Sequence, residues 1–138
     1  MDDAKRYQQG MKLRRAVLGD EHVDRSIAAT TDFNRDFQNF ITRNAWGDIW
    51  SRPGLPRATR SLLTLAMLVA LNRDEEFRLH LRAAFKNGVT RDQLNEVLLQ
   101  SAIYCGVPAA NSAFRSAAEV FDEIDEEKKV NPKKRRRP

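Results

Sequence analysis

Residues 76–90 read EFRLHLRAAFKNGVT, which covers the end of one predicted helix and the start of the next. The apolar residues of this segment recur with the period of an α-helix. They are Phe77, Leu81, Ala84 and Phe85. Gly88 is typical of a helix end, and Thr90 with Gln93 has the T-x-x-Q spacing of a capping box. The stretch therefore predicts one helix over about residues 74–87 and another that begins at Thr90.

The rest of the chain also has helical patterns, without the alternation or the hairpin dipeptides that are typical of β-strands. We expect the other helices over residues 3–18, 32–50, 57–72 and about 108–127. The predicted breaks are Gly19, the segment with two prolines and a glycine at 51–56, and Gly106. The predicted fold is therefore all-α. We expect a single-domain bundle of about six helices over residues 1–127, followed by a disordered basic tail over residues 128–138.

Three of these helices have apolar residues that predict what they bury. The helix over residues 3–18 has a stripe of Tyr7, Met11 and Leu18. The helix over residues 32–50 is expected to bury Phe33, Phe37, Phe40 and Ile41. The helix over residues 57–72 is apolar almost all round, so it must be covered on every side. We therefore expect a homo-oligomer, although a central core helix would show the same pattern.

The net charge of +5 comes from the C-terminal end of the chain. Five of the 24 basic residues lie at positions 133–137, and the other 19 balance the 19 acidic residues. By its letters this run fits a nuclear-import or nucleic-acid-binding segment. A solvated tail is the favoured interpretation, because no RNA-binding signature or zinc-finger spacing accompanies the run. We expect no nucleic-acid partner.

Targeting and membrane signals are missing from the sequence. The longest apolar run, over residues 62–71, is about half of the roughly 20 residues that span a bilayer. The N-terminus lacks the apolar region of a signal peptide. The single cysteine, Cys105, cannot form an intramolecular disulfide, and it is expected to pack inside with Tyr104. A cytoplasmic protein without a membrane partner is the expected class.

The candidate chemistry lies on the helix over residues 74–87. Arg73, Glu76 and His80 have the spacing i, i+3, i+7, which places them on one stripe. A carboxylate beside a histidine favours the imidazolium and orients the ring, which suits a proton donor. Spacing alone favours a plain surface pair of Glu76 and His80. No metal site is expected, because these two residues have no clear third ligand.

Other candidate residues are open to two interpretations each. His22 is expected between two helices in a capping or surface role, or within reach of a neighbouring subunit's site. Trp46 and Trp50, at helical spacing, fit core packing better than a substrate platform. Arg57 and Arg60 are either ordinary exposed charges or a bidentate clamp for a carboxylate.

Four blocks of the sequence together resemble the carboxymuconolactone decarboxylase family, within the alkylhydroperoxidase-like superfamily. They are WSRPGL at 50–55, RSLLTLA at 60–66, the stretch at 76–90 and IYCGVPAANSAF at 103–114. The resemblance extends over nearly the whole chain and leaves out only the basic tail. It implies an all-α fold of the alkylhydroperoxidase type and a homohexamer.

The same resemblance implies a cofactor-free decarboxylase of aromatic-acid catabolism. Its substrate would be 4-carboxymuconolactone and its product 3-oxoadipate enol-lactone. His80 would be the proton donor and Glu76 its orienting partner. The substrate-binding candidates are Arg60 or Arg57 first, Arg73 second, and Trp46. No cofactor and no metal are expected.

Three alternatives stay open. The redox branch of the superfamily carries C-x-x-C-x-x-x-H on this helix, and registering that motif on His80 places its cysteines at Arg73 and Glu76. Thiol-dependent peroxidase chemistry is therefore disfavoured. A non-catalytic helical oligomer could bind nucleic acid through the tail. A decarboxylase or lyase of the same fold acting on a different lactone or keto acid is the most serious rival.

Overall fold

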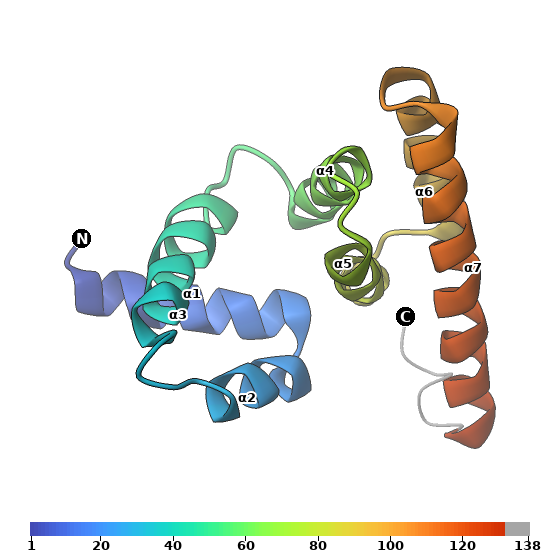
Figure 1. Ribbon diagram of the computed structural model, residues 1–138. Coiled ribbons are helices and arrows are strands. Elements are labelled where there is room, and N and C mark those ends of the chain that lie inside the picture. Colours follow the sequence, from blue (N-terminus) through green and yellow to red (C-terminus); the bar gives the residue numbers. More distant parts are fainter. Residues whose placement is uncertain (132–138) are drawn as a thin grey trace. The chain divides into compact units, whose positions relative to one another are not determined.

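The computed structural model describes residues 1–131, and within that range it consists of helices and their connections (Figure 1). Seven α-helices and one π-helix, η1, are present there: α1 Asp3–Leu18, α2 Asp20–Ala28, α3 Arg35–Ile41, η1 Thr42–Trp50, α4 Arg57–Ala70, α5 Asp74–Lys86, α6 Arg91–Tyr104 and α7 Val107–Val130. The described residues contain no strand. The predicted all-α class is confirmed.

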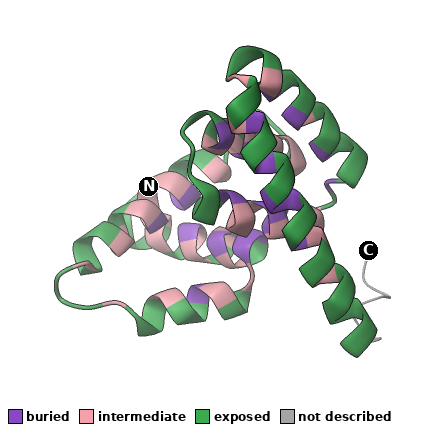
Figure 2. Cartoon of the chain, turned by 45° about the vertical axis from the view of Figure 1, so that its right-hand side comes forward, coloured by how far each residue is buried: buried purple, intermediate pink, exposed green. Residues whose placement is uncertain are grey.

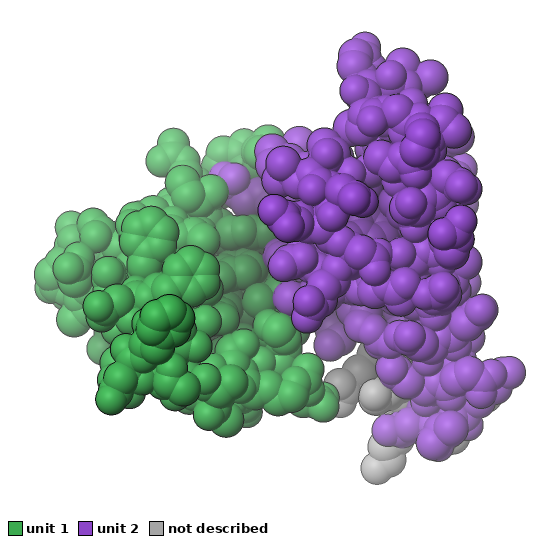
Figure 3. All heavy atoms as spheres, in the orientation of Figure 1, with its two compact units in different colours: residues 1–57 green, residues 58–138 purple. Residues whose placement is uncertain are grey.

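The chain divides into two compact units, residues 1–57 and residues 58–138 (Figure 3). The single helical domain predicted over residues 1–127 stays a prediction. Helix α7 continues to Val130, so the first three residues of the predicted tail are helical rather than disordered. The remaining tail prediction, for residues 132–138, lies outside the described residues.

In the first unit, α1 lies directly against η1. The side chain of Asp2 caps α1 by accepting a hydrogen bond from the Lys5 backbone N–H at 2.8 Å, and Gly19 ends the helix with a φ of 92°. Gly10 has no side chain to separate the backbones, since a Cβ atom there would lie 1.9 Å from the Thr42 carbonyl oxygen. Close backbone approach therefore decides which face of α1 is buried.

The buried face of α1 differs from the stripe predicted for the helix over residues 3–18. The buried residues of α1 are Gly10, Arg14, Val17 and Leu18. Of the predicted stripe only Leu18 is buried, because Tyr7 and Met11 lie at the border of the contact and are half-buried. Arg14 thus lies on the buried face of α1, although it was not part of the predicted apolar stripe.

Two predictions for the region between residues 19 and 50 are wrong. His22 does not lie between helices, because it belongs to α2. The helix predicted over residues 32–50 does form over residues 35–50, where α3 continues directly into η1. Phe33, Phe37 and Phe40 were expected to be buried, yet they are 98%, 60% and 56% exposed. The buried residues of η1 are Thr42, Trp46 and Gly47, and the absence of a side chain at Gly47 lets the helix approach the α1 backbone.

The second unit buries one face from each of its four helices (Figure 2). The core contains Leu65 and Val69 of α4, Phe77, Leu81 and Ala84 of α5, Leu94 and Leu98 of α6, and Ala113, Ala117 and Val120 of α7. Helix α7 contacts both α5 and α6. The capping box that opens α6 is formed as predicted, with Gln93 N–H donating to the Thr90 hydroxyl at 3.1 Å. These contacts fix the orientation of α5.

Helix α4 is not covered on every side by the described residues. Its buried residues are Ser61, Leu65 and Val69, one turn apart, whereas Leu63 and Met67 are 44% and 60% exposed. The described residues therefore bury one stripe of α4 fully and leave other apolar side chains of the helix exposed.

Ion pairs join α5 to α7 along the solvent side of their contact. Arg78 pairs with Glu119, and Arg82 pairs with both Glu123 and Glu127. All of these side chains are at least partly exposed, so each pair contributes little stability by itself. Together they favour one register of α5 along α7.

Candidate functional site

The stripe of Arg73, Glu76 and His80 lies next to the buried face of α5. Phe77 and Leu81 anchor the helix, with 2% and 0% of their surface exposed. The neighbouring positions therefore lie at the edge of the core, where Glu76 is exposed and His80 is half-buried. This setting leaves an imidazole partly shielded from water and still accessible. The roles of His80 as proton donor and of Glu76 as its orienting partner stay predictions.

The three candidate arginines have different degrees of exposure. Arg57 is the first residue of α4 and is exposed, while Arg60, one turn later, is half-buried. Arg73 is exposed and stands at the N-cap of α5, where its side chain makes no cap hydrogen bond. A partly buried guanidinium binds a carboxylate more strongly than an exposed one, because water screens it less. Burial therefore favours Arg60 over Arg57 and Arg73 as the arginine that binds a carboxylate.

Trp46 belongs to the core of the first unit. It is 6% exposed, and its ring stacks on Trp50 with the centroids 4.9 Å apart and the planes at 27°. This is the packing arrangement that the spacing of the two residues favoured. Contact of Trp46 with a substrate stays a prediction.

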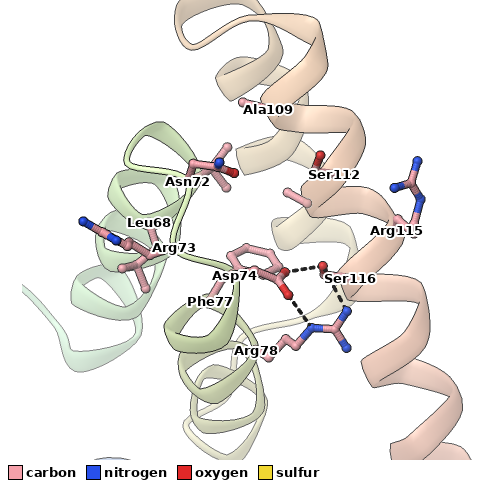
Figure 4. Close-up of a pocket in the computed structure, with 12 residues that line it drawn as sticks. Leu68, Asn72, Arg73, Asp74, Phe77, Arg78, Ala109, Ser112, Arg115 and Ser116 are labelled. Carbon is pink, nitrogen blue, oxygen red and sulfur yellow. Dashed lines mark hydrogen bonds and ion pairs between the residues drawn. The ribbon is translucent and has the colours of Figure 1, made fainter.

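A cavity of about 310 Å³ lies between the end of α4, the start of α5 and α7 (Figure 4). Its polar wall is a hydrogen-bonded trio in which Asp74 accepts from the Ser116 hydroxyl and from Arg78 Nε, the latter at 2.9 Å. The hydrogen bond from Ser116, with help from Arg78, holds the pKa of Asp74 below its usual value. Arg78 keeps a pKa above its usual value through hydrogen bonds to Glu119 and Asp74.

Arg73 is the only predicted site residue that lines this cavity, and Figure 4 shows its side chain directed away from the trio. Sequence reasoning missed the trio. The i, i+4 spacing of Asp74 and Arg78 signals an ion pair, but Ser116 lies 42 residues further along the chain from Asp74. Only the packing of α7 on α5 brings them together.

A second cavity of about 310 Å³ lies between α4 and α6 and is lined mainly by apolar side chains. Tyr104 and Cys105 line it at the end of α6. Both were expected to pack inside, and that prediction is wrong, since Tyr104 is 83% exposed and Cys105 is exposed. Helix α6 ends at Tyr104, and the turn at Gly106 starts α7 in a new direction, so these residues fall outside the core.

The described residues contain no group of three or more histidine, cysteine, aspartate or glutamate side chains that could hold a metal ion. Among them, too, no helix has the length and apolar character needed to cross a membrane.

The chain is similar to decarboxylases over most of its length. The model of the carboxymuconolactone decarboxylase family matches residues 35–119. A 4-carboxymuconolactone decarboxylase of Acinetobacter baylyi is 56% identical over 124 residues, which are 90% of this chain and 92% of that protein. The nitrosuccinic acid decarboxylase npaB of Metarhizium robertsii is 43% identical over 78% of this chain and 75% of its own. The match to the family model and the identity across nearly the full length show that this chain belongs to the carboxymuconolactone decarboxylase family.

Proposed function

We propose that the chain is a carboxy-lyase that converts 4-carboxymuconolactone to 3-oxoadipate enol-lactone in the catabolism of protocatechuate and related aromatic acids. The observation that carries this proposal is the 56% identity to a 4-carboxymuconolactone decarboxylase over 90% of the chain. The blocks at 50–55, 60–66, 76–90 and 103–114, which carried the resemblance in the sequence, all lie within the family match at residues 35–119.

The chemistry of this substrate explains why amino-acid side chains suffice. When the carboxylate leaves as CO2, its electron pair moves through the ring double bond onto the lactone carbonyl oxygen. The resulting enolate takes a proton at the carbon beside the carbonyl and becomes the product. The electron sink is thus part of the substrate. The protein has to stabilise the developing negative charge and to deliver one proton to carbon.

His80 is the side chain proposed to deliver that proton. An imidazole changes its charge near neutral pH, and a half-buried position limits competition from water. Glu76 precedes it by one helical turn on the same stripe, where a carboxylate can orient the ring and favour its protonated form. General-acid help of this kind is worth about 10²–10⁴-fold in rate.

Arg60 is proposed to hold the carboxymethyl group that the product retains, with Arg57 and Arg73 as the alternatives. A guanidinium can bind this group through two parallel hydrogen bonds. Equally tight binding of the departing carboxylate would stabilise the ground state and slow the reaction. The clamp should therefore act on the retained carboxylate.

The test is CO2 release from freshly generated 4-carboxymuconolactone without added cofactor. Wild type should release CO2 rapidly, and His80→Ala should be slower by about 10²-fold or more. His22→Ala is the matched control, because His22 is the chain's other histidine and lies on α2. Release by wild type and His80→Ala at equal rates would remove His80 from the mechanism. No release by wild type would refute the substrate.

Decarboxylation of nitrosuccinic acid is the second candidate function. The specific observation in its favour is the 43% identity to a nitrosuccinic acid decarboxylase over 78% of the chain. The two reactions share the need to stabilise an electron pair left by CO2. Assaying both acids with the same protein separates the candidates, because the true substrate should give the higher kcat/KM. The lower identity places this acid second.

The protein is further proposed to act as a homo-oligomer, for which the family resemblance suggests a homohexamer. Apolar side chains that one chain leaves exposed support the proposal, among them Met67 of α4 and Leu99 and Ile103 of α6. Sedimentation of wild type should give a mass several times that of one chain. An Ile103→Asp variant should sediment as a smaller species, because a charge is costly to bury at an interface. A wild-type monomer would refute the proposal.

A cytoplasmic location is proposed on the same resemblance.

A further inference from the structure

Arg14 is a buried cation in the first unit. It lies on α1 with 5% of its surface exposed. Its Nη1 donates a hydrogen bond to the Thr42 hydroxyl at 3.3 Å, and its Nη2 donates to the Gln38 side-chain oxygen at 3.2 Å. Both acceptors are neutral. The Nε group is buried and has no acceptor among the described residues.

No carboxylate contacts this guanidinium in the described part of the chain. The neighbouring Arg15, which is more exposed, pairs with both Asp20 and Asp24. Arg6, two turns before Arg14, pairs with Asp48. The two more exposed arginines of α1 thus have counterions, and among the described residues the buried one has none. Burial lowers the pKa of Arg14 from its ordinary value, and a guanidinium remains charged at neutral pH.

The position of the guanidinium is fixed by its surroundings. Gly10, one turn earlier on α1, brings the helix into backbone contact with Thr42. The Thr42 hydroxyl in turn donates to the Gln38 carbonyl oxygen at 2.7 Å, so both acceptors of Arg14 belong to one hydrogen-bonded group. This group spans the junction of α3 and the π-helix η1, and π-helical turns are frequent at functional sites. Arg14 is therefore held in one orientation.

A buried charge without a counterion is costly, and native proteins normally pair or hydrogen-bond it fully. A guanidinium has five N–H donors in a planar fork. With two used, the remaining donors match the two oxygens of a carboxylate in a bidentate arrangement. A carboxylate would supply both the missing charge and the missing acceptors.

We propose that Arg14 is an anion site whose ligand is a carboxylate. The carboxylate comes either from a small dicarboxylic acid or from an aspartate or glutamate of a second copy of the chain. Such a site would exist whether or not the chain decarboxylates a lactone, so its test must not depend on turnover.

The first test is calorimetric titration of the full chain with sodium succinate, with sodium chloride at matched ionic strength as the reference. If the ligand is a small acid, wild type should bind succinate, and its melting temperature should rise with succinate concentration by mass action. Arg14→Met should lose both effects, while Arg15→Met, the matched control, should keep them. Arg14→Lys keeps the charge without the fork and should bind more weakly than wild type.

The stability of Arg14→Met distinguishes an anion site from a purely structural role, in which Arg14 only joins α1 to α3 and η1 by its hydrogen bonds. Replacing an uncompensated buried charge by an apolar side chain of similar length is often neutral or stabilising. Where assembly is unchanged, Arg14→Met should therefore melt no lower than wild type in the absence of carboxylates. A purely structural role would give a lower melting temperature in Arg14→Met, with no succinate effect in wild type and no change in assembly, and would overturn the proposal.

A second experiment, sedimentation at several protein concentrations, distinguishes a small acid from a second copy of the chain as the source of the carboxylate. Assembly that is lost in Arg14→Met and retained in Arg15→Met and Arg14→Lys assigns the carboxylate to a second copy. Unchanged assembly together with an Arg14-dependent succinate response assigns it to a small molecule. Unchanged assembly and no difference between the succinate responses of wild type and Arg14→Met would refute the site.

Discussion

Replacing Gly10 by alanine should separate α1 from η1 and destabilise the first unit. The new methyl carbon would lie 1.9 Å from the Thr42 carbonyl oxygen and 2.9 Å from the Gly47 backbone nitrogen. Carbon and oxygen atoms of neighbouring segments normally approach no closer than about 3.3 Å. Both close atoms belong to the backbone, so no side chain can rotate out of the way. The two helices would have to move apart by more than ~1 Å.

The size of the effect follows from two opposing terms. Overpacking a well-packed contact typically costs about 1–3 kcal/mol, and a clash with backbone belongs at the upper end of that range. Alanine is a better helix former than glycine by about 1 kcal/mol, which offsets part of the loss. We therefore expect Gly10→Ala to lower the free energy of unfolding by about 2 kcal/mol or more.

Urea unfolding followed by tryptophan fluorescence measures this directly, because both tryptophans of the chain, Trp46 and Trp50, lie in η1. Gly54→Ala is the matched control, since a Cβ atom there meets nothing within 4 Å. The control should stay within ~0.5 kcal/mol of wild type or be slightly more stable. Equal midpoints for Gly10→Ala and Gly54→Ala would refute the close contact of α1 with η1.

Three further predictions concern the second unit. Thr90→Ala removes the cap of α6 and should lower stability by about 1 kcal/mol in urea unfolding, whereas Thr90→Ser should retain it; equal losses would contradict the capping box. The pKa of Asp74 is lowered by Ser116, so the carboxylate stabilises the fold above the ordinary aspartate pKa of ~3.9 and loses that effect as pH falls through its lower folded value. The melting temperature of wild type should therefore exceed that of Asp74→Asn at neutral pH, and the gap should close on acidification; a pH-independent gap would argue against this linkage. Leu81→Ala, at 0% exposure, should lose about 2–5 kcal/mol, and Leu99→Ala, at 50% exposure, should change little; similar losses would show that the α5 face is not core.

The elements of the candidate site differ in how far the sequence predicts them. The stripe of Arg73, Glu76 and His80 follows from helical spacing, because residues three and four apart share a face. The trio of Asp74, Arg78 and Ser116 does not, since it depends on how α7 lies along α5. Local periodicity carries no information about the register between two helices that are distant in the sequence.

The sequence by itself determined the all-α class and the ends of several helices, because these depend on residues a few positions apart. Gly19 and Gly106 adopt positive φ values where helices end or begin, and the capping box at Thr90 forms from its own local residues. Only the tertiary structure decided which faces are buried. Arg14 is buried because α1 and η1 meet where glycines allow their backbones to touch, whereas Phe33 lies in the turn before α3 and is exposed. That contact is set by steric fit between distant segments, which apolar periodicity along one helix cannot encode.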